Sequence, residues 1–166
     1  MIELIVLDVD GTMTDGKITY SSKGEELKSF CVKDGLAIAS WKALGKKAAI
    51  ITGRESEIVK KRAKELKIDF FYQKIKQKAL KVEEVLKELN LTWQNVAVIG
   101  DDLNDYSMLS RAAISFTPQN GVEFIKDRVD VVLKNSGGSG AVREMIEYLI
   151  KQEGLEEEFL NLWDAK

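Results

Sequence analysis

Short runs of aliphatic residues alternate along this chain with longer stretches in which apolar residues recur at helical spacing. Strands are predicted where the aliphatic runs end in turn residues, at 4–8, 48–52, 69–72, 96–100, 113–116 and 129–133. Helices are predicted between them, at 34–44, 55–66, 78–89, 103–111, 120–126 and 140–152. Short apolar strands that alternate with helices are typical of an α/β fold with a doubly wound, Rossmann-like parallel sheet.

One segment departs from this alternation. Residues 17–32 alternate apolar and polar side chains around Ser21-Ser22-Lys23-Gly24, which predicts a β-hairpin inserted at about 16–32, directly after the first strand. Because a two-stranded ribbon alone is marginally stable in water, we expect it to pack on another surface, such as that of a second subunit.

The C-terminal tail, about 153–166, carries an apolar stripe near helical spacing, made of Leu155, Phe159, Leu162 and Trp163. We expect this stripe to cover the domain's own core, with a partner surface as the alternative. No linker, repeat or low-complexity run interrupts the chain, so residues 1–166 are predicted to form a single domain.

Composition narrows the function. The net charge of −2 gives no electrostatic basis for binding nucleic acid or an anionic membrane, and no stretch approaches the roughly 18 apolar residues of a membrane span, so we expect a cytoplasmic protein. The chain has no histidine, which excludes Ser-His and Cys-His nucleophiles and histidine metal sites. Its one cysteine, Cys31, excludes an internal disulfide. Catalysis would have to use carboxylates, lysines and hydroxyls.

Polar side chains of complementary types stand at the ends of four predicted strands. They are Asp8 and Asp10 after the first strand, Thr52-Gly53-Arg54 after the second, Lys78 at the helix start after the third, and Asp101-Asp102-Leu103-Asn104-Asp105 after the fourth. If the strands are parallel, all four ends lie along one edge of the sheet, where open α/β sheets bind ligands. Carboxylates, a hydroxyl and two cations at that edge suit a phosphate together with Mg²⁺.

Each of these features also has a simpler interpretation. Thr52-Gly53 alone could be a helix N-cap turn, Lys78 competes with Lys74, Lys76 and Lys81 of a solvated helix start, and the Asp101–Asp105 run could be N-cap chemistry. A calcium loop of the EF-hand type at Asp8 needs Gly and Glu where the chain has Met13 and Thr19. Three carboxylates in five residues exceed what capping needs, and the four features together favour a site.

In order and spacing, these pieces resemble the four motifs of the haloacid dehalogenase-type phosphatase superfamily. The resemblance implies that Asp8 is the nucleophile and Asp10 the acid/base, and that Thr52 and Lys78 bind the phosphoryl oxygens. It implies that Mg²⁺ is held by Asp8, by the backbone carbonyl of Asp10 and by Asp101. Asp105 would orient Lys78 or a metal-bound water, and Asp102 would support the site from behind the metal ligands.

The gaps between these motifs leave no room for a cap domain. There are 42 positions from Asp10 to Thr52 and 26 from Thr52 to Lys78, whereas a folded cap needs roughly 50 residues or more. The chain thus resembles the capless 3-deoxy-D-manno-octulosonate 8-phosphate phosphatases. The segments that carry this resemblance are Asp15-Gly16-Lys17-Ile18, Gly24-Glu25-Glu26-Leu27-Lys28, Val32-Lys33-Asp34-Gly35 and Gly137-Gly138-Ser139-Gly140-Ala141-Val142-Arg143-Glu144.

The resemblance implies a magnesium-dependent homotetramer that removes phosphate from an acidic eight-carbon sugar on the route to lipopolysaccharide. It places substrate contacts at Asp10, Lys33, Asp34, Gly35, Gly53, Arg54, Arg62 and Lys78. Arg54 and Arg62, eight residues apart, are expected on the same side of one helix, where they could bind a sugar carboxylate. A solvated position is the alternative for Arg62.

Two other functions remain open from the sequence. The chain could dephosphorylate another acidic sugar phosphate, such as a nonulosonate 9-phosphate, or a broad range of sugar phosphates. It could also be a non-catalytic oligomerisation module, as in the C-terminal part of some sialic acid cytidylyltransferases. The presence of Asp8, Asp10, Lys78 and Asp101 together argues against a non-catalytic module, which has no use for clustered carboxylates.

Overall fold

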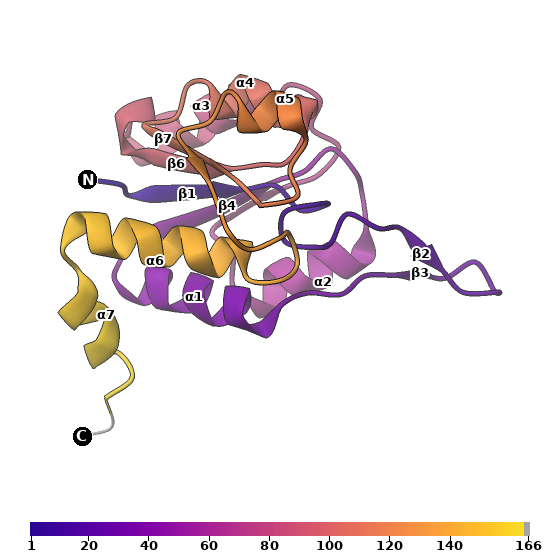
Figure 1. The fold of residues 1–166 in the computed structure, drawn as a ribbon, viewed down its shortest axis with the longest axis horizontal. Coiled ribbons are helices and arrows are strands. Elements are labelled where there is room, and N and C mark those ends of the chain that lie inside the picture. Colours follow the sequence, from indigo (N-terminus) through magenta and orange to yellow (C-terminus); the bar gives the residue numbers. More distant parts are fainter. Residues whose placement is uncertain (165–166) are drawn as a thin grey trace.

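A six-stranded parallel β-sheet forms the centre of the computed structural model, which describes residues 1–164 (Figure 1). Its strands, in spatial order, are β5 (Phe70–Tyr72), β4 (Lys47–Ile51), β1 (Leu4–Leu7), β6 (Val96–Ile99), β7 (Ile114–Thr117) and β8 (Val131–Val132). Each pair of neighbours in this order is parallel. The predicted doubly wound parallel sheet is confirmed.

Helices cover both faces of the sheet (Figure 1). One face carries α1 (Val32–Ala43), α2 (Glu57–Glu65) and α6 (Ala141–Glu153), and the other carries α3 (Lys78–Leu89), α4 (Tyr106–Leu109) and α5 (Glu123–Lys126). The central strand β1 serves both cores because its side chains alternate between the faces. Ile5 and Leu7 pack with α1 and α6, while Leu4 and Val6 pack with α3 and α4.

Several element boundaries differ from the prediction. The helix predicted at 103–111 is a short 3-10 helix, η2 (Leu103–Asp105), followed by the single turn of α4, and the side chain of Asp102 caps its start at Leu103. A second 3-10 helix, η1 (Trp93–Asn95), precedes β6 and was not predicted. The edge strand predicted at 129–133 pairs over β8 alone.

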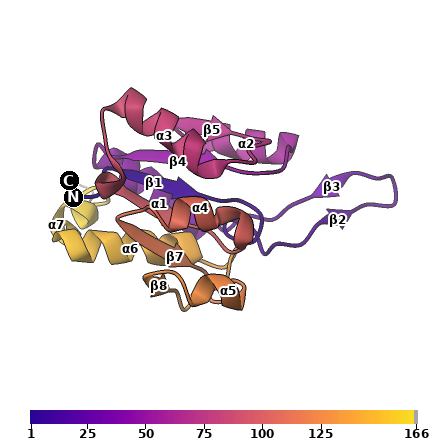
Figure 2. The same cartoon turned by 90° about the horizontal axis from the view of Figure 1, so that it is seen from above.

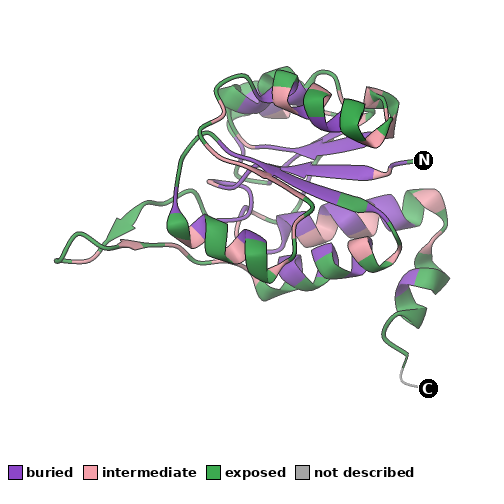
Figure 3. Cartoon of the chain, turned by 180° about the vertical axis from the view of Figure 1, so that it is seen from behind, coloured by how far each residue is buried: buried purple, intermediate pink, exposed green. Residues whose placement is uncertain are grey.

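The predicted hairpin is present, but its paired strands are only two residues each. β2 (Thr19–Tyr20) and β3 (Glu26–Leu27) pair antiparallel and project from the carboxyl end of the sheet, away from the body of the domain (Figure 2). Much of this ribbon is exposed (Figure 3), including the apolar side chains of Ile18, Tyr20 and Leu27. In this single chain these three apolar side chains therefore remain largely uncovered.

The C-terminal tail continues beyond the end of α6 as α7 (Glu156–Asn161), which lies at a steep angle to α6 (Figure 1). Phe159 is buried in the core with α1 and α6, and the indole Nε1 of Trp163 donates a hydrogen bond to Ser40 Oγ at 3.1 Å. The expected covering of the domain's own core holds for Phe159 and for the partly buried Leu155, whereas Leu162 and Trp163 are exposed. Residues 165 and 166 of the predicted tail lie outside the described residues.

The sheet topology determines where a ligand can bind. From β1 the chain continues to β4 and β5 on one side and returns through β6, β7 and β8 on the other. The order therefore reverses between β1 and β6, and the crevice at the carboxyl ends of such strands is the usual ligand site of open α/β sheets. Over residues 1–164, no helix combines the length and the apolar character needed to cross a membrane.

Candidate active site

Three carboxylates converge at the carboxyl ends of β1 and β6. These strands pair in register, with Leu7 opposite Ile99, so the residues that follow them come together. Carboxylate oxygens of Asp8, Asp101 and Asp105 all lie within 4.8 Å of one another. Like charges this close repel unless a proton, a cation or an ammonium group compensates them.

Lys78 supplies part of that compensation. It is the first residue of α3, its side chain is fully buried, and Nζ lies 2.6 Å from Oδ1 of both Asp8 and Asp105. The other lysines considered for this role lie elsewhere: Lys74 pairs with Glu55, and Lys81 pairs with Glu84 on the surface. The structure thus brings the predicted lysine to the carboxylates.

Asp105 is occupied by protein contacts. One of its oxygens binds Lys78, and the other accepts hydrogen bonds from the backbone N–H groups of Asp101 (2.9 Å) and Asp102 (3.3 Å). It therefore orients Lys78 and the loop after β6, as expected. Asp102 is exposed, and its Oδ1 accepts a hydrogen bond of 2.7 Å from Leu103 N, which caps the start of η2. Asp102 therefore has the simpler capping role that the sequence also allowed. Asp8 and Asp101 are left as the carboxylates available to a cation.

The electrostatics of the cluster favour a bound cation. Burial, and next the neighbouring Asp105 carboxylate, raise the pKa of Asp8 well above its usual range, although Lys78 opposes this. The same two causes raise the pKa of Asp101 to about 6. Burial lowers the pKa of Lys78, but its ion pairs outweigh burial and the pKa is raised overall. When ionised, the three carboxylates carry more negative charge than Lys78 neutralises, and a hard divalent cation would balance the remainder.

The loop after β1 must pass very close to Asp101. Gly11 has φ of +95°, and a Cβ there would lie 2.0 Å from Asp101 Oδ2. Thr12 Oγ1 donates a hydrogen bond of 3.4 Å to the same carboxylate. Two more glycines pack against this loop. Gly138 N donates a hydrogen bond to Thr12 O at 3.1 Å, and a Cβ at Gly137 would lie 1.9 Å from Gly11 O.

Replacing Gly137 by Ala is therefore expected to displace the Gly11 loop. The new Cβ overlaps backbone atoms, so we expect a loss of about 1–3 kcal/mol of unfolding free energy and a larger loss of activity. Ser139→Ala, an exposed position in the same loop, is the control. Urea unfolding and phosphate release measure the two effects, and equal behaviour of the two variants would contradict the tight packing.

A small pocket opens beside Asp8. It has a volume of about 90 Å³ and is lined by Asp8, Asp10, Thr52, Gly53, Arg54 and Asn104. Thr52 is buried, and its backbone is fixed by hydrogen bonds from Thr52 N to Tyr72 O (3.0 Å) and from Ile75 N to Thr52 O (3.1 Å). Asn104 was not predicted as a site residue; its position between Asp101 and Asp105 was the available signal.

Besides Lys78, four predicted substrate contacts do not line this pocket. Lys33, Asp34 and Gly35 form the first turn of α1, and Arg62 from α2 packs against Gly35, with Nη2 only 2.5 Å from the place where a Gly35 Cβ would be. The expectation that Arg54 and Arg62 share one side of a helix is wrong. Arg54 lies in the loop before α2, which begins at Glu57, and its guanidinium is directed to Asp10 and Glu26.

Asp34 contacts α6 rather than the pocket. Its side chain is buried, and Oδ1 accepts a hydrogen bond of 2.9 Å from Arg143 N in the first turn of α6. Its Oδ2 has no hydrogen-bond partner among the described residues. Burial raises the pKa of Asp34 to about 6 even though the Arg143 N–H, Arg62 and Arg143 favour the ionised form.

This pKa predicts a pH dependence of stability. The folded-state pKa lies above the unfolded value, so the contribution of Asp34 is fully present below pH ~4 and is lost as the pH rises through about 6. Asp34→Asn keeps an acceptor for Arg143 N but does not titrate. Its free energy of unfolding should therefore change with pH by about 2 kcal/mol less than that of the wild type. Urea unfolding of both proteins at pH 4 and 7.5 measures it, and parallel pH profiles would contradict the assignment.

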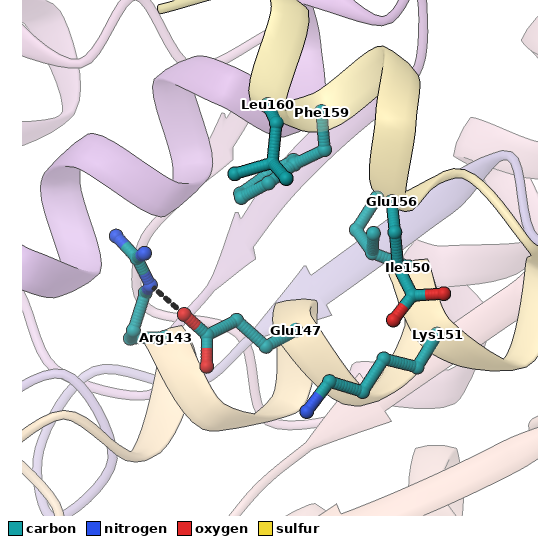
Figure 4. A pocket seen from close by; sticks show the side chains of 7 residues that line it. All are labelled: Arg143, Glu147, Ile150, Lys151, Glu156, Phe159 and Leu160. Carbon is teal, nitrogen blue, oxygen red and sulfur yellow. Dashed lines mark hydrogen bonds and ion pairs between the residues drawn. The ribbon is translucent and has the colours of Figure 1, made fainter.

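A larger groove lies between α6 and α7 and shares no lining residue with the pocket at Asp8 (Figure 4). Its volume is about 270 Å³, and Ile150, Phe159 and Leu160 form its apolar part. Its charged residues partly neutralise one another, since Arg143 Nε pairs with Glu147 at 2.6 Å. The groove lacks a cluster of reactive groups, so the smaller pocket at Asp8 is the candidate active site.

Comparison with known proteins agrees with this choice. Residues 70–146 match the family model of haloacid dehalogenase-like hydrolases. The chain is 37% identical over 153 residues to the 3-deoxy-D-manno-octulosonate 8-phosphate phosphatase KdsC of Escherichia coli, covering 92% of this chain and 81% of that protein. It belongs to the KdsC family of haloacid dehalogenase-like phosphatases.

Solved structures of KdsC phosphatases extend the similarity to the whole fold. A crystal structure of the Moraxella catarrhalis phosphatase, in complex with magnesium, phosphate and KDO, matches with a TM-score of 0.94 and 37% identity, covering 98% of this chain and 94% of that chain. A cobalt-bound KdsC-type phosphatase from Haemophilus influenzae matches with a TM-score of 0.88 and 34% identity, covering 92% and 90%.

Proposed function

We propose that this protein is a Mg²⁺-dependent phosphatase that hydrolyses 3-deoxy-D-manno-octulosonate 8-phosphate to the free sugar acid and phosphate, in lipopolysaccharide precursor biosynthesis. One observation carries the proposal. The carboxylate of Asp8 lines a pocket together with Asp10 and Thr52 and pairs with the buried ammonium group of Lys78. Membership in the KdsC family supports the substrate.

The reaction would proceed in two displacements at phosphorus. A carboxylate oxygen of Asp8 bonds to phosphorus while the bond to the sugar oxygen breaks, and Asp10 gives that oxygen its proton. Water then attacks phosphorus and gives a proton to Asp10, and the bond to Asp8 breaks to release phosphate. Lys78 and the Thr52 hydroxyl hold the phosphoryl oxygens in both steps.

Asp8 and Asp101 would hold Mg²⁺ through their carboxylates, together with the backbone carbonyl of Asp10. The raised pKa values of Asp8, which is buried, and of Asp101, which is half-buried, support this, because a bound cation favours the ionised form of both carboxylates. The bound ion supplies positive charge against the charge of the phosphoryl group. Asp105 and Asp102 contribute by fixing Lys78 and the loop.

Arg54 is the residue best placed to bind the sugar part of the substrate. It lines the pocket beside Gly53, and its side chain is 44% exposed, so it can reach a carboxylate at the pocket mouth. Lys33, Asp34, Gly35 and Arg62 lie together at the start of α1, and we propose that they act at a substrate-facing surface completed by a neighbouring subunit.

We propose that residues 1–166 are one catalytic domain without a cap and that it works as a homotetramer in the cytoplasm. The exposed apolar side chains of Ile18, Tyr20 and Leu27 on the hairpin support an assembly, since a monomer gains nothing from presenting them to water. Light scattering at micromolar concentration tests it, and a monomer would rule out a shared site.

The substrate is tested by a panel of phosphate esters. We expect Mg²⁺-dependent phosphate release from 3-deoxy-D-manno-octulosonate 8-phosphate with kcat/KM at least about 100-fold above that for hexose phosphates, because a site that binds a substrate carboxylate rejects sugars that lack it. EDTA should abolish the activity. Equal turnover of both groups would favour a broad-range sugar phosphatase, and preference for a nonulosonate 9-phosphate would identify a different acidic sugar.

A further inference from the structure

Four charged side chains form a closed ring between the hairpin and the pocket. Lys28 Nζ lies 2.5 Å from Asp10 Oδ1 and 3.3 Å from Glu26 Oε1. Arg54 closes the ring from the loop after β4, with Nη2 3.3 Å from Glu26 Oε1 and Nε 3.9 Å from Asp10 Oδ2. Positive and negative groups therefore alternate around the ring, and two of its four members come from the hairpin.

Lys28 is the most buried member. Its side chain has no solvent exposure, whereas those of Asp10, Glu26 and Arg54 are 22%, 21% and 44% exposed. Removing an ammonium group from water is costly unless it is paired with carboxylates. Glu26 and Lys28 are two residues apart at the end of β3, which places both side chains on the same face of the ribbon, toward the domain.

Lys28 also fixes the orientation of Asp10. Among residues 1–164, it is the one hydrogen-bond donor to the Asp10 carboxylate. A group that gives a proton to a leaving oxygen and later takes one from water must be held in reach of both. Without Lys28, the Asp10 side chain is free to rotate or to pair with Arg54.

We propose that Lys28 is a positioning residue, which holds the Asp10 carboxyl toward the reacting oxygen and so connects the hairpin to both proton transfers. Glu26 pairs with both Lys28 and Arg54 and so keeps the ammonium group of Lys28 in place, while the side chain of Arg54 is still 44% exposed. The proposal rests on the proposed phosphatase function, in which Asp10 is the acid/base.

The choice of substrate distinguishes the reaction steps that need Asp10 from the one that does not. With p-nitrophenyl phosphate, the leaving nitrophenolate needs no proton, so transfer of the phosphoryl group to Asp8 does not depend on Asp10. Hydrolysis of the aspartyl-phosphate still does. We expect Lys28→Met to show a burst of one nitrophenolate per subunit at a rate within about threefold of wild type. Steady-state turnover should then be about 10- to 100-fold slower.

Turnover of the sugar phosphate should fall by a similar factor without a burst, since both of its steps use Asp10. Lys28→Arg should restore most of the activity because it keeps a cationic donor, and Lys23→Met, the same change at an exposed position of the hairpin turn, should leave kinetics unchanged. Thermal unfolding of each variant monitors folding. KM should change less than kcat, since the phosphate-binding groups are untouched.

Two results would overturn the proposal while leaving the phosphatase function intact. One is an unchanged steady-state rate in Lys28→Met. The other is an equal loss of burst rate and steady-state rate in a folded variant, which would mean that Lys28 binds phosphate or merely supports the pocket. A wild-type protein without Mg²⁺-dependent phosphatase activity would instead contradict the proposed function itself.

Discussion

Replacing Asp8 by Asn is expected to lower Mg²⁺-dependent phosphate release by about 10⁴-fold or more, because it removes the atom that bonds to phosphorus. The fold should persist. Lys78 keeps its pair with Asp105 at 2.6 Å, so the free energy of unfolding without metal should stay within about 1 kcal/mol of wild type. Phosphate-release assays and urea unfolding measure the two quantities.

The matched control is Asp102→Asn, at an exposed carboxylate three residues after the end of β6, the strand that pairs with β1 before Asp8. Its side chain caps η2, and Asn caps helices as well as Asp does, so activity should stay within a few fold of wild type. Activity of Asp8→Asn near the wild-type level would remove Asp8 as the nucleophile.

Replacing Lys78 by Met is expected to affect activity and stability together. The substitution leaves the buried Asp8 and Asp105 carboxylates without their ammonium partner, and breaking a buried pair in this way costs about 3–5 kcal/mol. Phosphate release should fall by about 10³-fold, since a donor to the transferring group is lost. Lys74→Met, which breaks an exposed pair with Glu55, should cost under about 1 kcal/mol.

The stability loss in Lys78→Met should depend on pH. Lys78 works against the raised pKa of Asp8, so removing it raises that pKa further. The folded variant then binds more protons than the unfolded chain, and its deficit in unfolding free energy should shrink as the pH falls below neutral. A deficit that is constant between pH 5 and 8 would contradict the buried pairing.

The sheet and the carboxylate cluster could be predicted from the sequence because both depend on local patterns. Buried aliphatic runs separated by helices specify a parallel sheet, and parallel strands place Asp8 and Asp101 at the same edge. The choice of Lys78 over Lys74 required the motif spacing, and burial in the structure agrees with it.

Contacts between distant segments could not be predicted in the same way. Lys28 reaches Asp10 from the far strand of the hairpin, and Asp34 accepts a hydrogen bond from Arg143 N, which lies 109 residues further along the chain in the first turn of α6. Neither contact leaves a periodic signal in the sequence. Arg54 was wrongly predicted to lie on the helix with Arg62. The helix α2 begins only at Glu57, and the residue before it, Ser56, donates its N–H to Gln73 Oε1 at 2.8 Å, a contact with a distant segment.

The central claim is that phosphate passes through a covalent bond to Asp8. The most direct test reacts Asp10→Asn, in which hydrolysis of the intermediate is slowed, with radiolabelled p-nitrophenyl phosphate and Mg²⁺, followed by acid quench and peptide mapping. We expect close to one labelled phosphate per subunit, on the peptide that contains Asp8, and no label in the Asp8→Asn protein. Label on a different residue, or turnover without any covalent label, would contradict the account.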